Sequence, residues 1–353
     1  MKRLAILILV LGLYLLAACG GGDSAETEKV LVINSWGGWF QDQQRVAMFE
    51  PFAQNSGIEV RELSDGENQF AKAKAQIEAG QPEMDIIHGD ASWLVRGQQE
   101  GIWAPIDYAQ VSKTNLYSDI LEEYGVGILY WSFNIVYNTN TFPDTHPDTW
   151  AEVWDYAQAN PGRVTLWGAR PNYVIEAALM AAGYEMSAIY PLDEQKLTDA
   201  FASLDKIKDV VVWFDTGSQG QKLFSDEEVV LGMFYGGDTF GLVDQGVPLQ
   251  VEWNQGVYTR DYWLVLKDAP HYANAMSFIN YVSQQADVQA NFARATGYGP
   301  INQTTFDLIT DEQALSRLPS WSPNKDKQLS YDSIWWGEHD DELGERWNNW
   351  LRQ

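Results

Sequence analysis

From residue 30 onward, short apolar runs alternate with stretches of helical spacing, and this alternation most restricts how the chain can fold. Val30–Asn34 is an apolar run that leads into the turn Ser35–Gly38. Apolar residues then recur at helical spacing over Gln41–Ser56, before a second predicted strand at Ile58–Leu63. Because strands that alternate with helices build parallel pairs, the sequence predicts an α/β fold with a mostly parallel sheet.

The same alternation continues through the middle of the chain. Further strands are predicted at residues 85–88, 128–137, 164–167, 210–214 and 229–235. Helices are predicted at 70–79, 173–182 and 197–208, and Thr149 has the position of a helix cap, with Glu152 at capping-box spacing. Ligands of open α/β sheets bind beyond the carboxyl ends of the strands, so the loops after these strands are the expected site.

The N-terminus predicts export. Lys2 and Arg3 precede an apolar run over Leu4–Leu16, which is too short to cross a bilayer comfortably. The run ends in small residues before Cys19, the only cysteine of the chain, and this arrangement resembles the bacterial lipobox. We expect residues 1–18 to be a signal peptide and 19–27 a lipidated tether, with the protein anchored at the periplasm or cell surface. The alternative is an ordinary signal peptide with an incidental cysteine.

Composition excludes several classes of function. The formal net charge is −26, so the chain lacks the cationic surplus that nucleic acids or anionic lipid surfaces require. One cysteine allows no intrachain disulfide and no thiolate zinc cluster. The chain also has 16 Trp and 17 Tyr, which either pack the core or line a binding cleft. None of the four histidines has metal-ligand spacing, and no cofactor is predicted.

The order of several segments resembles the extracellular solute-binding proteins of ABC importers, in the branch that binds spermidine and putrescine. The segments are Asn34–Gly38, Asp85–Asp107, Tyr137–Asn138 with Pro147–Trp150 and Trp154, Asp261–Val265 with Ala269–Pro270, Gly297–Asn302, and Trp335–Trp336 with Trp347–Leu351. Each segment is weakly specific alone, and their order and spacing carry the resemblance, which covers nearly all of the chain after the tether.

The resemblance implies a two-lobed periplasmic-binding-protein fold of type II, with the ligand in the cleft between two α/β lobes. It places residues 28–136 and 261–300 in the first lobe, and residues 137–260 and 301–353 in the second. It also implies a monomeric, non-enzymatic receptor that delivers a small solute to an ABC permease. A sugar-binding protein and a secreted glycoside hydrolase are the alternatives, because both use acidic and aromatic residues.

Three carboxylates are expected to bind the ligand. The resemblance implies that Asp261 binds an amine where the lobes cross, and that Asp90 contacts the ligand from the loop after a strand. Asp238 is a candidate second acceptor for an ammonium group. The alternatives are a salt bridge between Asp261 and Arg260, and helix-capping roles for Asp90 and Asp238.

Three aromatic residues are expected to form walls of the site. Trp36 lies at the turn after the first strand and matches an aromatic position of the polyamine-binding proteins. Tyr235 lies where those proteins carry a stacking tryptophan, and Tyr298 matches another wall. An aromatic face contributes about 0.5–2 kcal/mol to binding a cation. Core packing for Trp36 and turn packing for Tyr298 are the alternatives.

The chain departs from the polyamine-binding pattern at Arg170 and Tyr173, which occupy positions that are acidic in that branch. An arginine binds carboxylates and phosphonates rather than ammonium groups. This change favours a zwitterion with separated charges, such as an ω-amino acid or an aminophosphonate. Alternatively, Arg170 pairs with Glu176 or another local acid and the ligand is a polyamine. In both alternatives the predicted ligand is a small amine-bearing solute.

Overall fold

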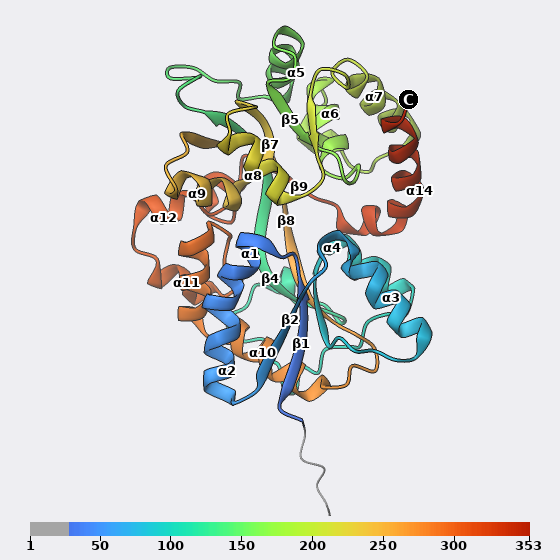
Figure 1. The fold of residues 1–353 in the computed structure, drawn as a ribbon, viewed down its shortest axis with the longest axis vertical. Coiled ribbons are helices and arrows are strands. Elements are labelled where there is room, and N and C mark those ends of the chain that lie inside the picture. Colours follow the sequence, from blue (N-terminus) through green and yellow to red (C-terminus); the bar gives the residue numbers. More distant parts are fainter. Residues whose placement is uncertain (1–27) are drawn as a thin grey trace, which may run out of the picture.

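The computed structural model describes residues 28–353, so the predicted signal peptide, tether and Cys19 lie outside the described residues. A nine-stranded mixed sheet with the order β2-β1-β3-β8-β4-β7-β5-β6 runs through the molecule, and β9 pairs with β8. Helices pack around it in two groups, which Figure 1 shows below and above the middle of the view. This arrangement confirms the predicted α/β class.

Strands β1 to β7 lie at or near the predicted strands, whereas β8 and β9 were not predicted. The strands are β1 (Val30–Ser35), β2 (Glu59–Ser64), β3 (Ile86–Asp90), β4 (Val126–Asn138), β5 (Val164–Trp167), β6 (Val212–Phe214), β7 (Leu231–Tyr235), β8 (Leu249–Val265) and β9 (Leu329–Ser330).

The helices are named in the same way. The α-helices are α1 (Gly38–Gln44), α2 (Glu50–Ser56), α3 (Gln69–Ala79), α4 (Ala91–Gln99), α5 (Trp150–Ala159), α6 (Val174–Ala181), α7 (Glu194–Leu204), α8 (Gly217–Ser225), α9 (Gly236–Asp244), α10 (Tyr272–Gln284), α11 (Ala286–Thr296), α12 (Glu312–Ser316), α13 (Ser322–Lys325) and α14 (Ser333–Leu351). A π-helical turn, η1 (Arg45–Phe49), joins α1 to α2, and the short 3₁₀ segments are η2 (Gly66–Asn68), η3 (Ser118–Ile120), η4 (Met186–Ala188) and η5 (Gln303–Leu308).

Two long antiparallel strands join the lobes. Strands β1, β2 and β3 pair in parallel in the first lobe, and β5, β6 and β7 do so in the second. Strands β4 and β8 pair with each other and run from one lobe to the other (Figure 1). All residues of β4 are buried, which explains its near-continuous apolar sequence.

Local capping explains several element ends. The Thr149 side chain accepts from the Glu152 N–H at the start of α5, as predicted. The predicted helix over 197–208 instead begins at Glu194, because the Asp193 carboxylate caps it by accepting from the Lys196 N–H. Asp90 caps α4 by accepting from the N–H groups of Ser92 and Trp93, so its predicted alternative role as a helix cap is confirmed.

The C-terminal part of the chain contacts both lobes. Helix α14 packs on α4, with Gly337 close to Val95, and the Trp347 indole N–H donates to the Gly168 carbonyl 2.7 Å away. Segments η5 and α12, which the predicted boundaries give to the second lobe, pack on α11. The exact division of the chain between lobes stays a prediction. Within residues 28–353, no helix combines the length and apolar character needed to span a membrane.

Candidate ligand-binding cavity

A cavity of about 160 Å³ lies where the two lobes meet. All eight residues predicted to bind the ligand line it, namely Trp36, Asp90, Arg170, Tyr173, Tyr235, Asp238, Asp261 and Tyr298. The volume is below the usual range for drug-sized ligands, so the cavity suits a small metabolite. The structure therefore brings the predicted residues together, and their binding roles stay predictions.

The carboxyl ends of parallel strands position much of the lining. Trp36 follows β1, Asp90 ends β3, and Tyr235 ends β7. After Trp36 the chain turns through Gly37 and Gly38, whose φ angles of 77° and 60° favour glycine. The usual rule for open α/β sheets thus accounts for why these sequence-distant residues meet.

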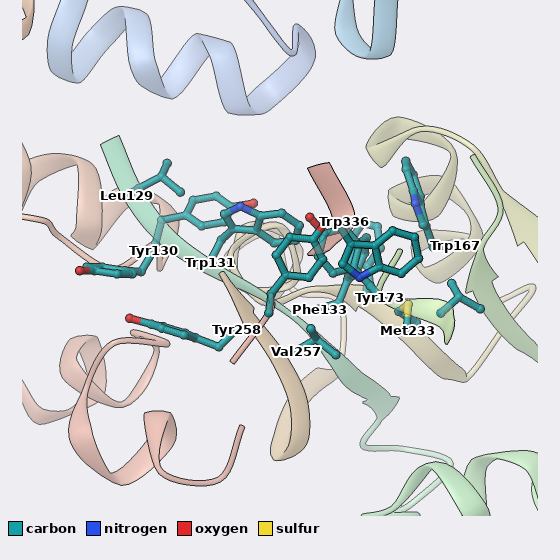
Figure 2. Close-up of a cluster of buried hydrophobic side chains, with 14 of the residues drawn as sticks. Leu129, Tyr130, Trp131, Phe133, Trp167, Tyr173, Met233, Val257, Tyr258 and Trp336 are labelled. Carbon is teal, nitrogen blue, oxygen red and sulfur yellow. The ribbon is translucent and has the colours of Figure 1, made fainter. Parts of the chain in front are cut away.

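Alternate residues of β4 form a further wall. Leu129, Trp131 and Phe133 line the cavity, because successive strand residues point to opposite faces. Tyr130, between them, instead stacks on Tyr258 with ring centroids 5.3 Å apart. Figure 2 shows this stacked pair at the left, with Trp131 and Phe133 extending toward Tyr173. The crossing strand therefore gives the cavity an apolar wall.

Asp261 is held by two side-chain donors. The Trp131 indole N–H donates to Oδ1 over 2.5 Å, and His88 Nε2 lies 2.7 Å from Oδ2. Burial raises the pKa of Asp261, and the His88 and Trp131 hydrogen bonds oppose this shift. The predicted alternative pairing with Arg260 is wrong, because Arg260 donates to the Tyr262 hydroxyl 2.5 Å away.

Asp238 is buried without a cationic partner among the described residues. Tyr298 donates its hydroxyl to Oδ1 over 3.0 Å, and the Gln221 amide donates to Oδ2 over 3.2 Å. Burial raises the pKa of Asp238 to about 6, although both hydrogen bonds favour the ionised form. Asp238 therefore changes charge in a pH range where most aspartates stay ionised.

Arg170 reaches across the cavity from the second lobe to the first. Its Nη1 lies 2.7 Å from Asp90 Oδ2, and its Nε lies 3.2 Å from Glu67 Oε2. Burial opposes the charge, but these carboxylates raise the pKa of Arg170 well above its usual value. The predicted alternative pairing with Glu176 is wrong, since Glu176 accepts from Tyr190 and from the Trp336 indole.

Several buried donors of the lining have no acceptor within the described part of the chain. They are the Trp167 indole N–H, the Tyr173 hydroxyl, and the Nε and Nη1 groups of Arg170, whose ion pairs lack hydrogen-bond geometry. Tyr173 also has a φ of 73°, a conformation that costs a non-glycine residue about 1–3 kcal/mol. Unpaired buried donors are costly, so this part of the cavity suits an acceptor.

Comparison with known proteins places the chain in a family. The family described as bacterial extracellular solute-binding protein matches residues 47–315. The chain belongs to this family. As a solute-binding protein it is a binder rather than an enzyme, so the glycoside hydrolase alternative is set aside.

Relatives of this solute-binding protein carry names of amine-bearing solutes. It is 29% identical to a gamma-aminobutyric acid-binding protein of Pseudomonas aeruginosa, with 94% of each chain covered. It is 23% identical to a spermidine/putrescine-binding periplasmic protein of Salmonella typhimurium, covering 76% of this chain and 77% of the relative.

Solved structures of binding proteins are also similar to this chain. A GABA receptor shares 34% identity with this solute-binding protein at a TM-score of 0.81, covering 91% of this chain and 97% of the receptor. The binding protein AgtB from A. tumefaciens R10, solved with agropinic acid, shares 31% identity at a TM-score of 0.83, with 92% and 99% covered. These structures confirm the predicted periplasmic-binding-protein fold.

Sequence reasoning missed several lining residues of this solute-binding protein. Glu67 follows β2 and Trp167 ends β5, so both lie at strand ends where the topology could have pointed to them. Trp131 and Phe133 follow from the two-residue period of β4 once its cavity-facing side is known. His88 does not line the cavity and reaches it through contacts with Asp261, Trp36 and Phe40, so no local pattern signals it.

Proposed function

We propose that this solute-binding protein captures a small zwitterion with separated charges, an ω-amino acid such as γ-aminobutyric acid, for an ABC importer. The observation that supports the proposal is that one cavity contains both carboxylates and hydrogen-bond donors. It holds buried carboxylates that suit an ammonium group, and unpaired buried donors that suit a carboxylate. A ligand with both groups satisfies both sets at once.

Asp261 is the proposed partner of the ligand ammonium. An ionised carboxylate has about four acceptor positions, and His88 and Trp131 occupy two of them. The remaining capacity and the negative charge are available to a ligand at the cavity. Asp238 offers a second acceptor, and burial of either carboxylate without a cation is unfavourable.

Arg170, Tyr173 and Trp167 are the proposed partners of the ligand carboxylate. The Trp167 indole N–H and the Tyr173 hydroxyl have no acceptor among the described residues. Arg170 would exchange its ion pairs with Asp90 and Glu67 for a pair with the ligand. A bound carboxylate would turn these costly donors into charge-assisted hydrogen bonds. The rings of Trp131, Phe133 and Tyr235 would enclose the methylene chain between the two charged ends.

The names of relatives support the amine group of the proposed ligand. They disagree on whether the ligand also has a carboxylate. Two of the compared proteins are named for γ-aminobutyric acid and others for polyamines. One observation favours a polyamine: five carboxylates line the cavity, those of Glu67, Asp90, Asp215, Asp238 and Asp261. Arg170 is the only cation among the described lining residues. A polyamine is therefore the second candidate.

Matched ligands separate the two candidates. Titration calorimetry compares four ligands that share an ammonium group and differ at the other end. They are γ-aminobutyric acid, its amide, n-butylamine and putrescine. The proposal expects γ-aminobutyric acid to bind tightest, because a second ammonium would face the Arg170 guanidinium. Tight putrescine binding with no response to any ω-amino acid or aminophosphonate would establish the polyamine candidate, and binding of sugars alone would exclude both.

Replacement of Arg170 gives a second, independent test. Arg170→Gln should abolish binding of γ-aminobutyric acid and leave or improve binding of putrescine, because Glu67 and Asp90 lose their cation. Arg61→Gln is a matched control, since it removes an arginine whose ion pair with Glu59 is exposed on β2. Equal losses for both ligands would indicate that Arg170 is only structural.

Lipid anchoring and delivery complete the proposal. We propose that Cys19 is lipidated, that the protein acts as a monomer, and that it delivers its ligand to a membrane permease. Cys19→Ser should move the protein from the membrane fraction to the soluble fraction and prevent labelling by fatty acids. Unchanged membrane fractionation would contradict the anchor, without bearing on ligand binding.

A further inference from the structure

A chain of buried polar side chains runs from β1 to the candidate cavity. The Ser35 hydroxyl donates to Gln44 Oε1 over 2.5 Å, Gln44 Nε2 lies 3.0 Å from His88 Nδ1, and His88 Nε2 lies 2.7 Å from Asp261 Oδ2. Ser35, Gln44 and His88 are completely buried, and Asp261 is 6% exposed at the cavity. The first three do not line the cavity, and their hydrogen bonds reach it through Asp261.

The order of donors and acceptors along this chain assigns a position to the proton of His88. Gln44 accepts the Ser35 proton at its oxygen, so its NH₂ group faces His88 Nδ1. An amide NH₂ only donates, so Nδ1 must be the acceptor and carry no proton. The single ring proton is then on Nε2, directed at the Asp261 carboxylate.

A neutral histidine has a particular consequence for Asp261. It donates one hydrogen bond and adds no positive charge, so the carboxylate keeps its full negative charge for a ligand. An imidazolium at 2.7 Å would neutralise much of that charge. The aromatic rings of Trp36, Phe40 and Trp263 surround His88, with centroids 5.4–5.9 Å away, and hold the ring in place.

We propose that His88 is a positioning residue that determines specificity: held neutral by Gln44, it orients Asp261 and keeps it available for a ligand ammonium. The inference rests on the proposed function, because Asp261 must be the ammonium partner. Sequence spacing gives no hint of it, since His88 and Asp261 are 173 residues apart and meet only where β3 pairs with β8. Asp90, opposite Asp261 in that register, uses its Oδ1 for capping α4 and Oδ2 for Arg170.

Removal and replacement of the donor test the positioning role. The probe is whichever of γ-aminobutyric acid and putrescine binds wild type tighter. His88→Leu should lower its affinity by about 10- to 100-fold, the usual range for losing a hydrogen bond to a charged group. His88→Gln, whose amide N–H can reach Asp261, should restore most of this loss.

His271→Gln is the matched control. His271 also pairs with a buried aspartate, with Nδ1 2.9 Å from Asp85, but neither residue lines the cavity. The substitution His271→Gln should leave the affinity for the probe unchanged. If His88→Leu binds like wild type, or if His88→Gln gives no rescue in a folded protein, the positioning role is wrong.

A change at Gln44 tests the proton assignment without touching His88. In Gln44→Glu, a carboxylate would face Nδ1 and bring a second proton onto the ring, so the imidazolium would compete with the ligand for Asp261. Affinity for the amine should fall about tenfold or more, whereas Gln44→Met should have a smaller effect. Nitrogen NMR should show one protonated ring nitrogen in wild type and two in Gln44→Glu; two in wild type would overturn the assignment.

Asp261→Asn separates this inference from the proposed function. If Asp261→Asn binds the probe as wild type does, the proposed amine site is wrong and the role of His88 falls with it. If Asp261→Asn loses binding while His88→Leu and Gln44→Glu retain it, the proposed site stands and only the positioning role is wrong. Thermal unfolding of each variant confirms that differences in affinity arise in folded protein.

Discussion

Two buried aspartates, Asp85 and Asp261, each pair with a histidine, yet their surroundings differ in one respect. Asp85 accepts from the backbone N–H groups of Val32 and His271, at 2.8 and 2.7 Å, and lies 2.9 Å from the His271 ring. Within residues 28–353, the donors to Asp261 are the side chains of His88 and Trp131, and Asp261 borders the cavity. The first carboxylate has three donors and lies away from the cavity, whereas the second has two and keeps acceptor capacity where another molecule could bind.

This difference distinguishes structural from binding carboxylates better than burial or histidine contact does. Both aspartates are buried and both touch an imidazole. Backbone donors fix Asp85 to the strands it joins, since they cannot move without unfolding. Side-chain donors instead leave Asp261 directed at open volume. The comparison predicts opposite effects for the same substitution at the two positions.

The largest expected effect is on binding at Asp261. Asp261→Asn keeps the shape and removes the charge, so affinity for the amine ligand should fall by about 2–5 kcal/mol. The free energy of unfolding should change little. Loss of a charge whose burial raises the pKa of Asp261 stabilises the folded protein, but the new NH₂ group must face the Trp131 or the His88 donor. Calorimetry and urea unfolding measure the two quantities. If Asp261→Asn binds the ligand with wild-type affinity, Asp261 does not bind the ligand amine.

Asp85 should show the reverse pattern. Asp85→Asn replaces charge-assisted hydrogen bonds with weaker ones and forces one NH₂ group toward a donor. We expect the free energy of unfolding to fall by about 1.5–3 kcal/mol, with ligand affinity unchanged once the protein is folded. A loss of affinity as large as that of Asp261→Asn would show that the two carboxylates cannot be told apart in this way.

Asp238 extends the comparison to a cavity carboxylate with no histidine. Its pKa of about 6 in the free protein must fall when an ammonium binds beside it. Affinity is therefore full above pH 6 and declines as pH falls through 6, by at most about tenfold per pH unit for one proton. Calorimetry across pH 4.5–8 measures this slope. A slope that persists in Asp238→Asn would assign it to other groups.

The same group has the opposite effect on stability in the absence of ligand. Because its folded pKa is raised above the ordinary value of 3.8, the protonated form is favoured in the folded protein. Asp238 therefore contributes stability below about pH 4 that is lost as pH rises through 6. Urea unfolding of wild type and Asp238→Asn, compared over that pH window, should show the difference, and identical profiles would contradict the raised pKa.

The smallest expected effect is at Tyr298, one of the two neutral donors to Asp238. Tyr298→Phe removes a hydrogen bond that favours the ionised carboxylate, so the pKa of Asp238 should rise further. The midpoint of the pH dependence should move upward, and affinity at neutral pH should fall by about 1 kcal/mol. An unchanged midpoint would indicate that Tyr298 acts only as an aromatic wall.

Much of the fold could be predicted because its signals are local. The apolar run at residues 164–167 is β5, and Thr149 caps α5, because both depend on neighbours within a few residues. Parallel pairing follows from the βαβ alternation, whereas the position of β8 between β3 and β4 was not predicted. The predicted helix over 197–208 is shifted relative to α7, because the Asp193 cap starts the helix at Glu194. Local patterns thus determined most elements up to β7 and, with small errors, their ends, whereas β8 and the later helices were not predicted.

The sequence by itself also predicted eight of the residues that gather at the cavity, through strand ends and family resemblance. Only the tertiary structure decided what each of them contacts. Arg170 faces Asp90 and Glu67 across the lobes rather than Glu176, and Asp261 faces His88 rather than Arg260. Short-range patterns report periodicity and capping, whereas these pairs join residues about 80 to 173 positions apart. The partner of each residue depends on how separate strands align in one sheet and how the lobes meet. Because these side chains are buried, their partners determine whether they are charged.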